Sequence, residues 1–166
     1  MASTYSFDVT TSCDLQEVDN AVNQAQKEVT QRFDFKGSHI LIDFKRGDNL
    51  IQMEAEGDMR MEALLDVLRG KLIKRGVPVK NLEITDPKPG SGEILRREIK
   101  LKMALDSDQA KKVSATIKDA KLKKVTASIQ GDQVRVSSPD KDALQEAIGV
   151  LRKADFEVEL QFGNFR

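Results

Sequence analysis

The chain has 166 residues, 39% hydrophobic and 33% charged, with a formal net charge of zero. This composition is globular and excludes a disordered chain. No apolar run approaches the ~20 residues that span a bilayer, and the polar N-terminus lacks the apolar segment of a signal peptide. The single cysteine, Cys13, excludes an internal disulfide. We therefore expect a cytoplasmic protein with no membrane partner.

The first half of the chain predicts a strand, a helix, two strands, a helix and a short strand. Alternating apolar residues indicate half-buried strands, and spacings of three and four indicate amphipathic helices. The strands are expected at 5–9, 40–44, 51–55 and 82–84, and the helices at 15–29 and 61–72.

A linker is predicted at 86–92, where two prolines and two glycines occur in seven residues. Such a stretch continues neither a helix nor a central strand. The predicted domains are therefore 1–85 and 93–166, separated by this linker.

The second half repeats the order of the first. Its strands are expected at 95–103, 125–129, 134–136 and 158–162, and its helices at 110–120 and 144–151. Gly47-Asp48 and Gly131-Asp132 form turns at matching places, which supports an internal repeat. The fold class is therefore α+β, a tandem of two ferredoxin-like βαββαβ domains that resemble RNA-recognition folds. Each domain is expected to be an antiparallel sheet with both helices on one face.

The open face of the second sheet is predicted to bind an anion. Residues 91–135 carry 11 basic and 6 acidic residues, and alternation turns many polar side chains away from the helices. Arg binds phosphates or guanine edges in a bidentate manner, and Gln both donates and accepts hydrogen bonds. The candidate nucleotide-binding residues on this face are Arg96, Lys100, Lys102, Lys124, Ser128, Gln130, Gln133 and Arg135. A solvated sheet face without a ligand is the alternative interpretation.

A second candidate segment joins the first helix to the next strand. Arg32 and Lys36 alternate with Phe33 and Phe35, so the cations could hold phosphate while the rings stack on a base. Packing of both rings in the core or between domains is the favoured alternative.

Catalytic and metal-binding patterns are missing from the sequence. His39 is the only histidine and Cys13 the only cysteine, so a zinc site of the usual ligands is not predicted. No G-x-x-x-x-G-K-[ST] phosphate loop occurs. We therefore expect a protein that is not an enzyme and needs no cofactor or metal.

Several segments resemble the YajQ family of bacterial nucleotide-binding proteins. The matching stretches are 6–8, 19–25, 32–38, 71–77, 99–102, 127–136 and 160–166, in order along nearly the whole chain. The resemblance implies tandem ferredoxin-like domains and a nucleotide ligand, which is cyclic di-GMP in some members. It also implies action as an effector through a regulatory protein partner.

Two other functions stay open at this point. An RNA-binding module would use the same open face, although the strand aromatics typical of RNA-recognition domains are absent from it. A protein-interaction adaptor is suggested by Leu41 and Leu50, which are expected on the outward face of the first sheet.

Overall fold

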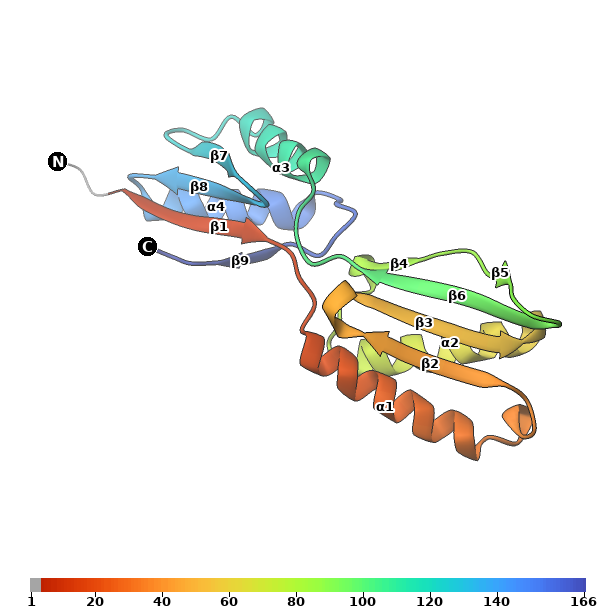
Figure 1. Cartoon of the computed structure of the whole chain (residues 1–166). Helices are drawn as coiled ribbons and strands as arrows, with labels where there is room; N and C mark the ends of the chain where they lie inside the picture. The colour runs from red at the N-terminus through yellow and green to blue at the C-terminus, as the bar shows by residue number, and fades with distance from the viewer. Residues whose placement is uncertain (1–3) are drawn as a thin grey trace. The chain divides into compact units, whose positions relative to one another are not determined.

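The computed structural model describes residues 4–166 (Figure 1). Within these residues the chain forms two antiparallel sheets and four α-helices, so the expected α+β class is confirmed. The chain divides into two compact units. Unit 1 contains the described residues before Cys13 together with Met103–Arg166, and unit 2 is Cys13–Lys102.

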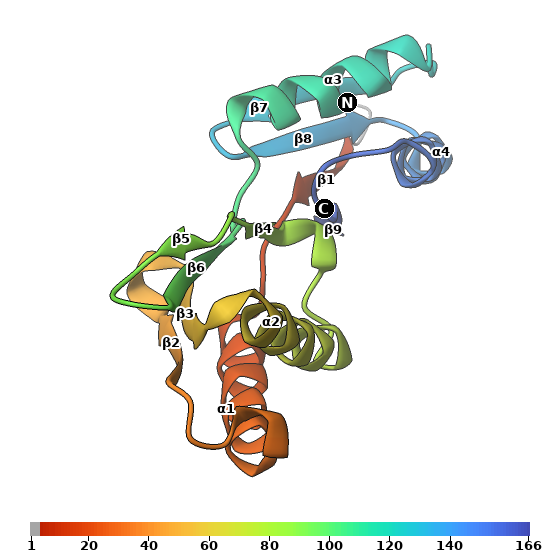
Figure 2. The same ribbon diagram turned by 90° about the vertical axis from the view of Figure 1, so that its right-hand side faces the viewer.

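Unit 2 is a sheet covered on one face by two helices. Its strands are β2 (Ile40–Lys45), β3 (Leu50–Glu56), β4 (Leu82–Ile84), β5 (Lys88–Pro89) and β6 (Ile94–Leu101), and its helices are α1 (Leu15–Gln31) and α2 (Gly57–Lys74). The strand order is β2-β3-β6-β4, and β5 also pairs with β6. Alternate side chains of β3, including Ile51 and Met53, are fully buried. They lie beneath α1 and α2, which pack against each other (Figure 2).

Unit 1 has the same kind of architecture. Its strands are β1 (Tyr5–Thr10), β7 (Thr126–Gln130), β8 (Gln133–Ser138) and β9 (Gln161–Gly163), and its helices are α3 (Ser107–Asp119) and α4 (Lys141–Lys153). The strand order is β7-β8-β1-β9. Phe7 and Val9 of β1 and Val134 and Val136 of β8 are fully buried in the core beside the apolar stripes of α3 and α4. Both helices therefore cover one face of this sheet.

Aspartates begin three of the four helices. Asp14 accepts backbone hydrogen bonds at the start of α1, and Asp140 does the same at the start of α4. Asp106 and Gln109 form a reciprocal capping box at the start of α3. These side chains satisfy amide groups that have no partner within the helix, which fixes where each helix starts.

The structure divides the chain differently from the boundaries expected at 86–92. The expected linker lies inside unit 2, where β5 pairs with β6. In unit 2, β6 lies between β3 and β4, with Ile51 opposite Ile99. In unit 1, β1 lies between β8 and β9, with Phe7 opposite Val136. The first strand of each expected half thus belongs to the sheet formed by the other half, because an alternating pattern does not specify which sheet a strand joins.

None of the helices in residues 4–166 is both long enough and apolar enough to cross a bilayer.

Candidate functional site

The face of the unit 1 sheet that is turned away from α3 and α4 is polar. Because alternate residues of β1 and β8 are buried against the helices, the intervening residues point to the opposite side. We call this set the polar face. Its members are Ser6, Asp8 and Thr10 of β1, Thr126, Ser128 and Gln130 of β7, Gln133, Arg135 and Ser137 of β8, and Gln161 of β9.

Strand register aligns these side chains in rows across the sheet. The middle row runs from Ser128 through Arg135 and Asp8 to Gly163. On one side of it, Ser137 lies opposite both Thr126 and Ser6, and on the other side Gln130 lies opposite Gln133. Neighbouring strands are about 5 Å apart, so one small ligand can meet hydroxyl, amide and guanidinium groups at the same time.

An ion pair occupies the centre of the polar face. Arg135 Nε donates to Asp8 Oδ1 at 3.0 Å, and Asn164 Nδ2 donates to Asp8 Oδ2 at 2.7 Å. Asp8 is only 4% exposed. The hydrogen bond from Arg135 lowers the pKa of Asp8, with Asn164 and the charge of Arg166 acting in the same direction and burial opposing them. Asp8 is therefore ionised at neutral pH and fixes the orientation of the Arg135 guanidinium.

The end of the chain contributes Asn164 through a shift in strand pairing. Asp8 lies opposite Gly163, whereas two residues away Ser6 exchanges backbone hydrogen bonds of 3.0 and 3.3 Å with Arg166. This register leaves one extra residue on the C-terminal segment. Asn164 has a positive φ of 51°, a conformation that asparagine adopts more readily than most residues. The result is a bulge that brings the Asn164 amide to Asp8.

The structure brings together five of the ten predicted site residues. Ser128, Gln130, Gln133 and Arg135 all belong to the polar face, and Lys124 lies two residues before β7. Among these, Arg135 keeps a half-buried guanidinium with N–H groups that Asp8 does not use. Such groups can bind a phosphate or the edge of a guanine base.

Arg96, Lys100 and Lys102 do not join this set. Arg96 and Lys100 lie on β6 and Lys102 follows it, so all three belong to unit 2. The expectation of one basic sheet surface is therefore wrong. The expectation fails because β6 pairs with β3 and β4 and not with β8.

The corresponding face of unit 2 is balanced in charge. Arg96 forms a salt bridge of 3.2 Å with Glu54, and His39 Nε2 lies 2.7 Å from the same carboxylate. A hollow of about 540 Å³ on this face is lined by four basic residues and three carboxylates. They are Lys45, Lys88, Arg96 and Arg97, and Glu54, Asp86 and Glu98. Leu41 is exposed and Leu50 is half-buried here. This surface therefore has no strong preference for an anion.

Arg32 and Lys36 lie beside a short 3₁₀ turn, η1 (Phe33–Phe35). Arg32 donates two hydrogen bonds to Asp34, at 3.0 and 2.8 Å, and its guanidinium lies over the ring of Phe35. Phe35 is buried, whereas Phe33 is exposed, so the core packing favoured from the sequence holds for only one of the two rings. Lys36 is exposed.

Ser6, Asp8, Thr10 and Asn164 are site residues that the sequence reasoning missed. The polar alternation of β1 was present in the sequence, but it was assigned to the other half of the chain. The bulge that positions Asn164 depends on pairing between the two ends of the chain. No local pattern specifies such pairing.

Within residues 4–166 no group of three or more His, Cys, Asp or Glu residues could hold a metal ion. Fold and site together define an α+β protein of two units, one of which has an open sheet face rich in hydrogen-bonding groups. A family model described as "Nucleotide-binding protein YajQ-like" matches residues 5–166. The chain belongs to this family, and the resemblance seen in the sequence is confirmed.

Full-length relatives agree with this assignment. The chain is 42% identical over 166 residues to a "Nucleotide-binding protein" of Chloroherpeton thalassium and 46% identical to one of Alkaliphilus oremlandii, in both cases over all of each chain. It is 48% identical over 161 residues to a nucleotide-binding protein of Pseudomonas putida, covering 97% of this chain and 98% of the other. All three relatives are described as nucleotide-binding proteins.

Proposed function

We propose that this chain is a non-catalytic nucleotide-binding protein whose ligand lies on the polar face of unit 1. The observation that carries the proposal is Arg135, which Asp8 orients in the middle of a row of hydroxyl and amide side chains. Phosphate oxygens would accept hydrogen bonds from the free guanidinium N–H groups and from the hydroxyls. Base edges would pair with the glutamine amides, which both donate and accept.

The ligand we favour contains guanine as well as phosphate. Arginine binds the O6 and N7 atoms of guanine in a bidentate manner, and the polar face carries no aromatic side chain for stacking. Cyclic di-GMP combines two guanines with two phosphates and suits this chemistry, with another nucleotide as the alternative. Binding without turnover would make the protein an effector that reports ligand concentration to a regulatory partner protein.

We infer that both units are ferredoxin-like domains. In unit 1 the strands occur in chain order as β1, β7, β8 and β9 and are arranged as β7-β8-β1-β9, which is the arrangement of a split βαβ fold. Unit 2 follows the same arrangement if β6 takes the place of the first strand. Domains of this architecture that recognise RNA bind through the open sheet face.

An RNA-binding function is the second candidate, and one observation favours it. Lys118, Lys121, Lys123 and Lys124 lie in and around the turn between α3 and β7, next to the polar face. All four are exposed, and none has a salt bridge within the described residues. A strand of RNA could place successive phosphates along them. Its affinity would then fall steeply with salt, whereas that of a small nucleotide would fall less.

Calorimetric titration of nucleotides, cyclic dinucleotides and short RNAs at two salt concentrations tests the proposal. Ser128→Asp with Gln130→Glu adds two negative charges to the polar face, at exposed side chains with no hydrogen bond within the described residues. We expect affinity to fall by about tenfold or more, since 1.4 kcal/mol suffices for that factor. Lys100→Glu changes the charge on the unit 2 sheet and should leave affinity unchanged. Unchanged affinity in the double variant, or a loss only in Lys100→Glu, would overturn the proposal.

A further inference from the structure

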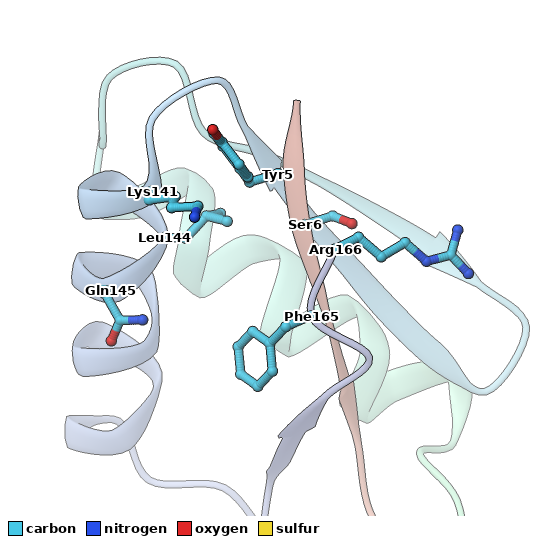
Figure 3. A pocket seen from close by; sticks show the side chains of 7 residues that line it. All are labelled: Tyr5, Ser6, Lys141, Leu144, Gln145, Phe165 and Arg166. Carbon is cyan, nitrogen blue, oxygen red and sulfur yellow. The ribbon is translucent and has the colours of Figure 1, made fainter. Parts of the chain in front are cut away.

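A separate pocket of about 340 Å³ lies on the helix side of unit 1, between α4 and the C-terminal segment (Figure 3). It is lined by the rings of Tyr5 and Phe165, by Lys141, Leu144 and Gln145 of α4, and by Ser6 and Arg166. The three α4 residues follow one another at helical spacings of three and one, so they share one side of the helix. The volume is close to the lower limit of about 300 Å³ for small-molecule pockets, which suits one ring system and its substituent.

Phe165 provides a fixed aromatic surface in this pocket. It is 61% exposed, although burial of an aromatic ring is favourable. Its ring centroid lies 6.0 Å from that of the buried Phe7, and the neighbouring Arg166 is held by two backbone hydrogen bonds to Ser6. An aromatic ring that is supported on one side and open on the other is a platform on which a flat ligand can stack.

The charges around the pocket favour an anion. The ammonium of Lys141 lies 4.8 Å from the centroid of the Tyr5 ring and has no carboxylate partner within the described residues. No aspartate or glutamate side chain lines the pocket. Gln145 adds an amide that can donate to and accept from the edge of a ligand ring.

We propose that this pocket is a second ligand site, which takes a single flat aromatic ring bearing an anionic group. The ring stacks on Phe165, and the anionic group lies near Lys141. A nucleoside monophosphate and an aromatic carboxylate share this chemistry.

The pocket meets the polar face at Ser6, which lines both, but Phe165 and Lys141 lie outside the polar face. Figure 3 shows the side chains of Phe165 and Arg166 leaving the C-terminal segment on opposite sides, with Phe165 turned toward α4. The charge of Arg166 acts on Asp8, which belongs to the polar face. A ligand that stacks on Phe165 beside Lys141 therefore requires neither Asp8 nor Arg135.

The chain offers a natural probe for this site. Tyr5 is its only tyrosine and it has no tryptophan, so tyrosine emission reports on the pocket. We would titrate the full-length protein with AMP, GMP and indole-3-acetate, and compare adenosine, which lacks the anion, and ribose 5-phosphate, which lacks the aromatic ring. Saturable changes are expected with the first three ligands and about tenfold weaker binding with the last two.

Variants show whether a ligand binds in the pocket or elsewhere. The control variants also show how much of the change in emission comes from light absorbed by the ligand. Phe165→Leu keeps an apolar contact with Phe7, and Lys141→Gln removes the positive charge but keeps a polar side chain. Each should weaken binding about tenfold. Phe33→Leu and Lys27→Gln change an exposed ring and a lysine of unit 2 and should have no effect. Ser128→Asp with Gln130→Glu should leave pocket binding intact even if it abolishes binding at the polar face. Unchanged binding in both pocket variants, loss of all ring binding in the polar-face variant, or no saturable change in the wild-type protein would overturn the proposal.

Discussion

Asp8 and Arg135 lie directly opposite each other on β1 and β8, 127 residues apart in the chain, and are joined by a hydrogen bond of 3.0 Å. This pair connects the strand that precedes unit 2 with a strand that follows it. Asn164, near the other end of the chain, bonds to the same carboxylate. The centre of the polar face thus depends on three segments that meet only in the folded protein.

Asp8→Asn should destabilise unit 1. The substitution removes the charge that Arg135 and Asn164 both bind, and the new amide cannot accept on both sides. We expect the free energy of unfolding to fall by about 1 to 3 kcal/mol, as for other hydrogen bonds to a charged group. Urea denaturation followed by circular dichroism measures this change. Equal stability of the variant and the wild-type protein would contradict the structural role of the pair.

The same pair predicts a dependence of stability on pH. Because the pKa of Asp8 is lowered in the folded state from its ordinary value of 3.8, its contribution is present above about pH 4 and is lost as the pH falls through the folded pKa. The difference in stability between wild type and Asp8→Asn should therefore be constant near neutral pH and shrink below about pH 4. A difference that widened on acidification would have the wrong sign.

Lys121→Gly should stabilise the protein. Lys121 follows the last residues of α3 with a φ of 52°, in the left-handed conformation that glycine usually supplies at helix ends. Relief of the Cβ contact is worth roughly 1 kcal/mol, partly offset by the greater freedom of glycine in the unfolded chain. Thermal denaturation should show a higher midpoint. Lys123→Gly is the control, because Lys123 lies three positions before β7 and has no positive φ. This substitution should not raise the midpoint of thermal denaturation.

The exchange of first strands predicts which fragments fold. A fragment of residues 13–102 contains every strand of the unit 2 sheet and should unfold cooperatively on heating. Residues 1–92 follow the boundary expected from the sequence and lack β6, which pairs with both β3 and β4. This fragment should show no cooperative transition by circular dichroism. Cooperative unfolding of 1–92 alone would contradict the observed pairing.

Local patterns predicted the elements well and their assembly poorly. The hairpin of β7 and β8 was placed correctly because its turn at Gly131, with a φ of 64°, lies in the sequence between its two strands. Four of its six polar-face residues were therefore among the predicted site residues. Arg96 and Lys100 were assigned to the wrong sheet, since the apolar alternation of β6 fits either one. The last strand was expected at 158–162 but lies at Gln161–Gly163, because Val158 is buried outside a strand.

Chemical-shift mapping of the ¹⁵N-labelled full-length protein with cyclic di-GMP, GMP and AMP tests the central claim most directly. The account predicts that the favoured ligand perturbs the backbone amides of the polar face, above all those of Ser128, Gln133 and Arg135. The amides around Lys100 should stay unchanged. Perturbations confined to residues 13–102, with none in β7, β8 or β1, would contradict the account.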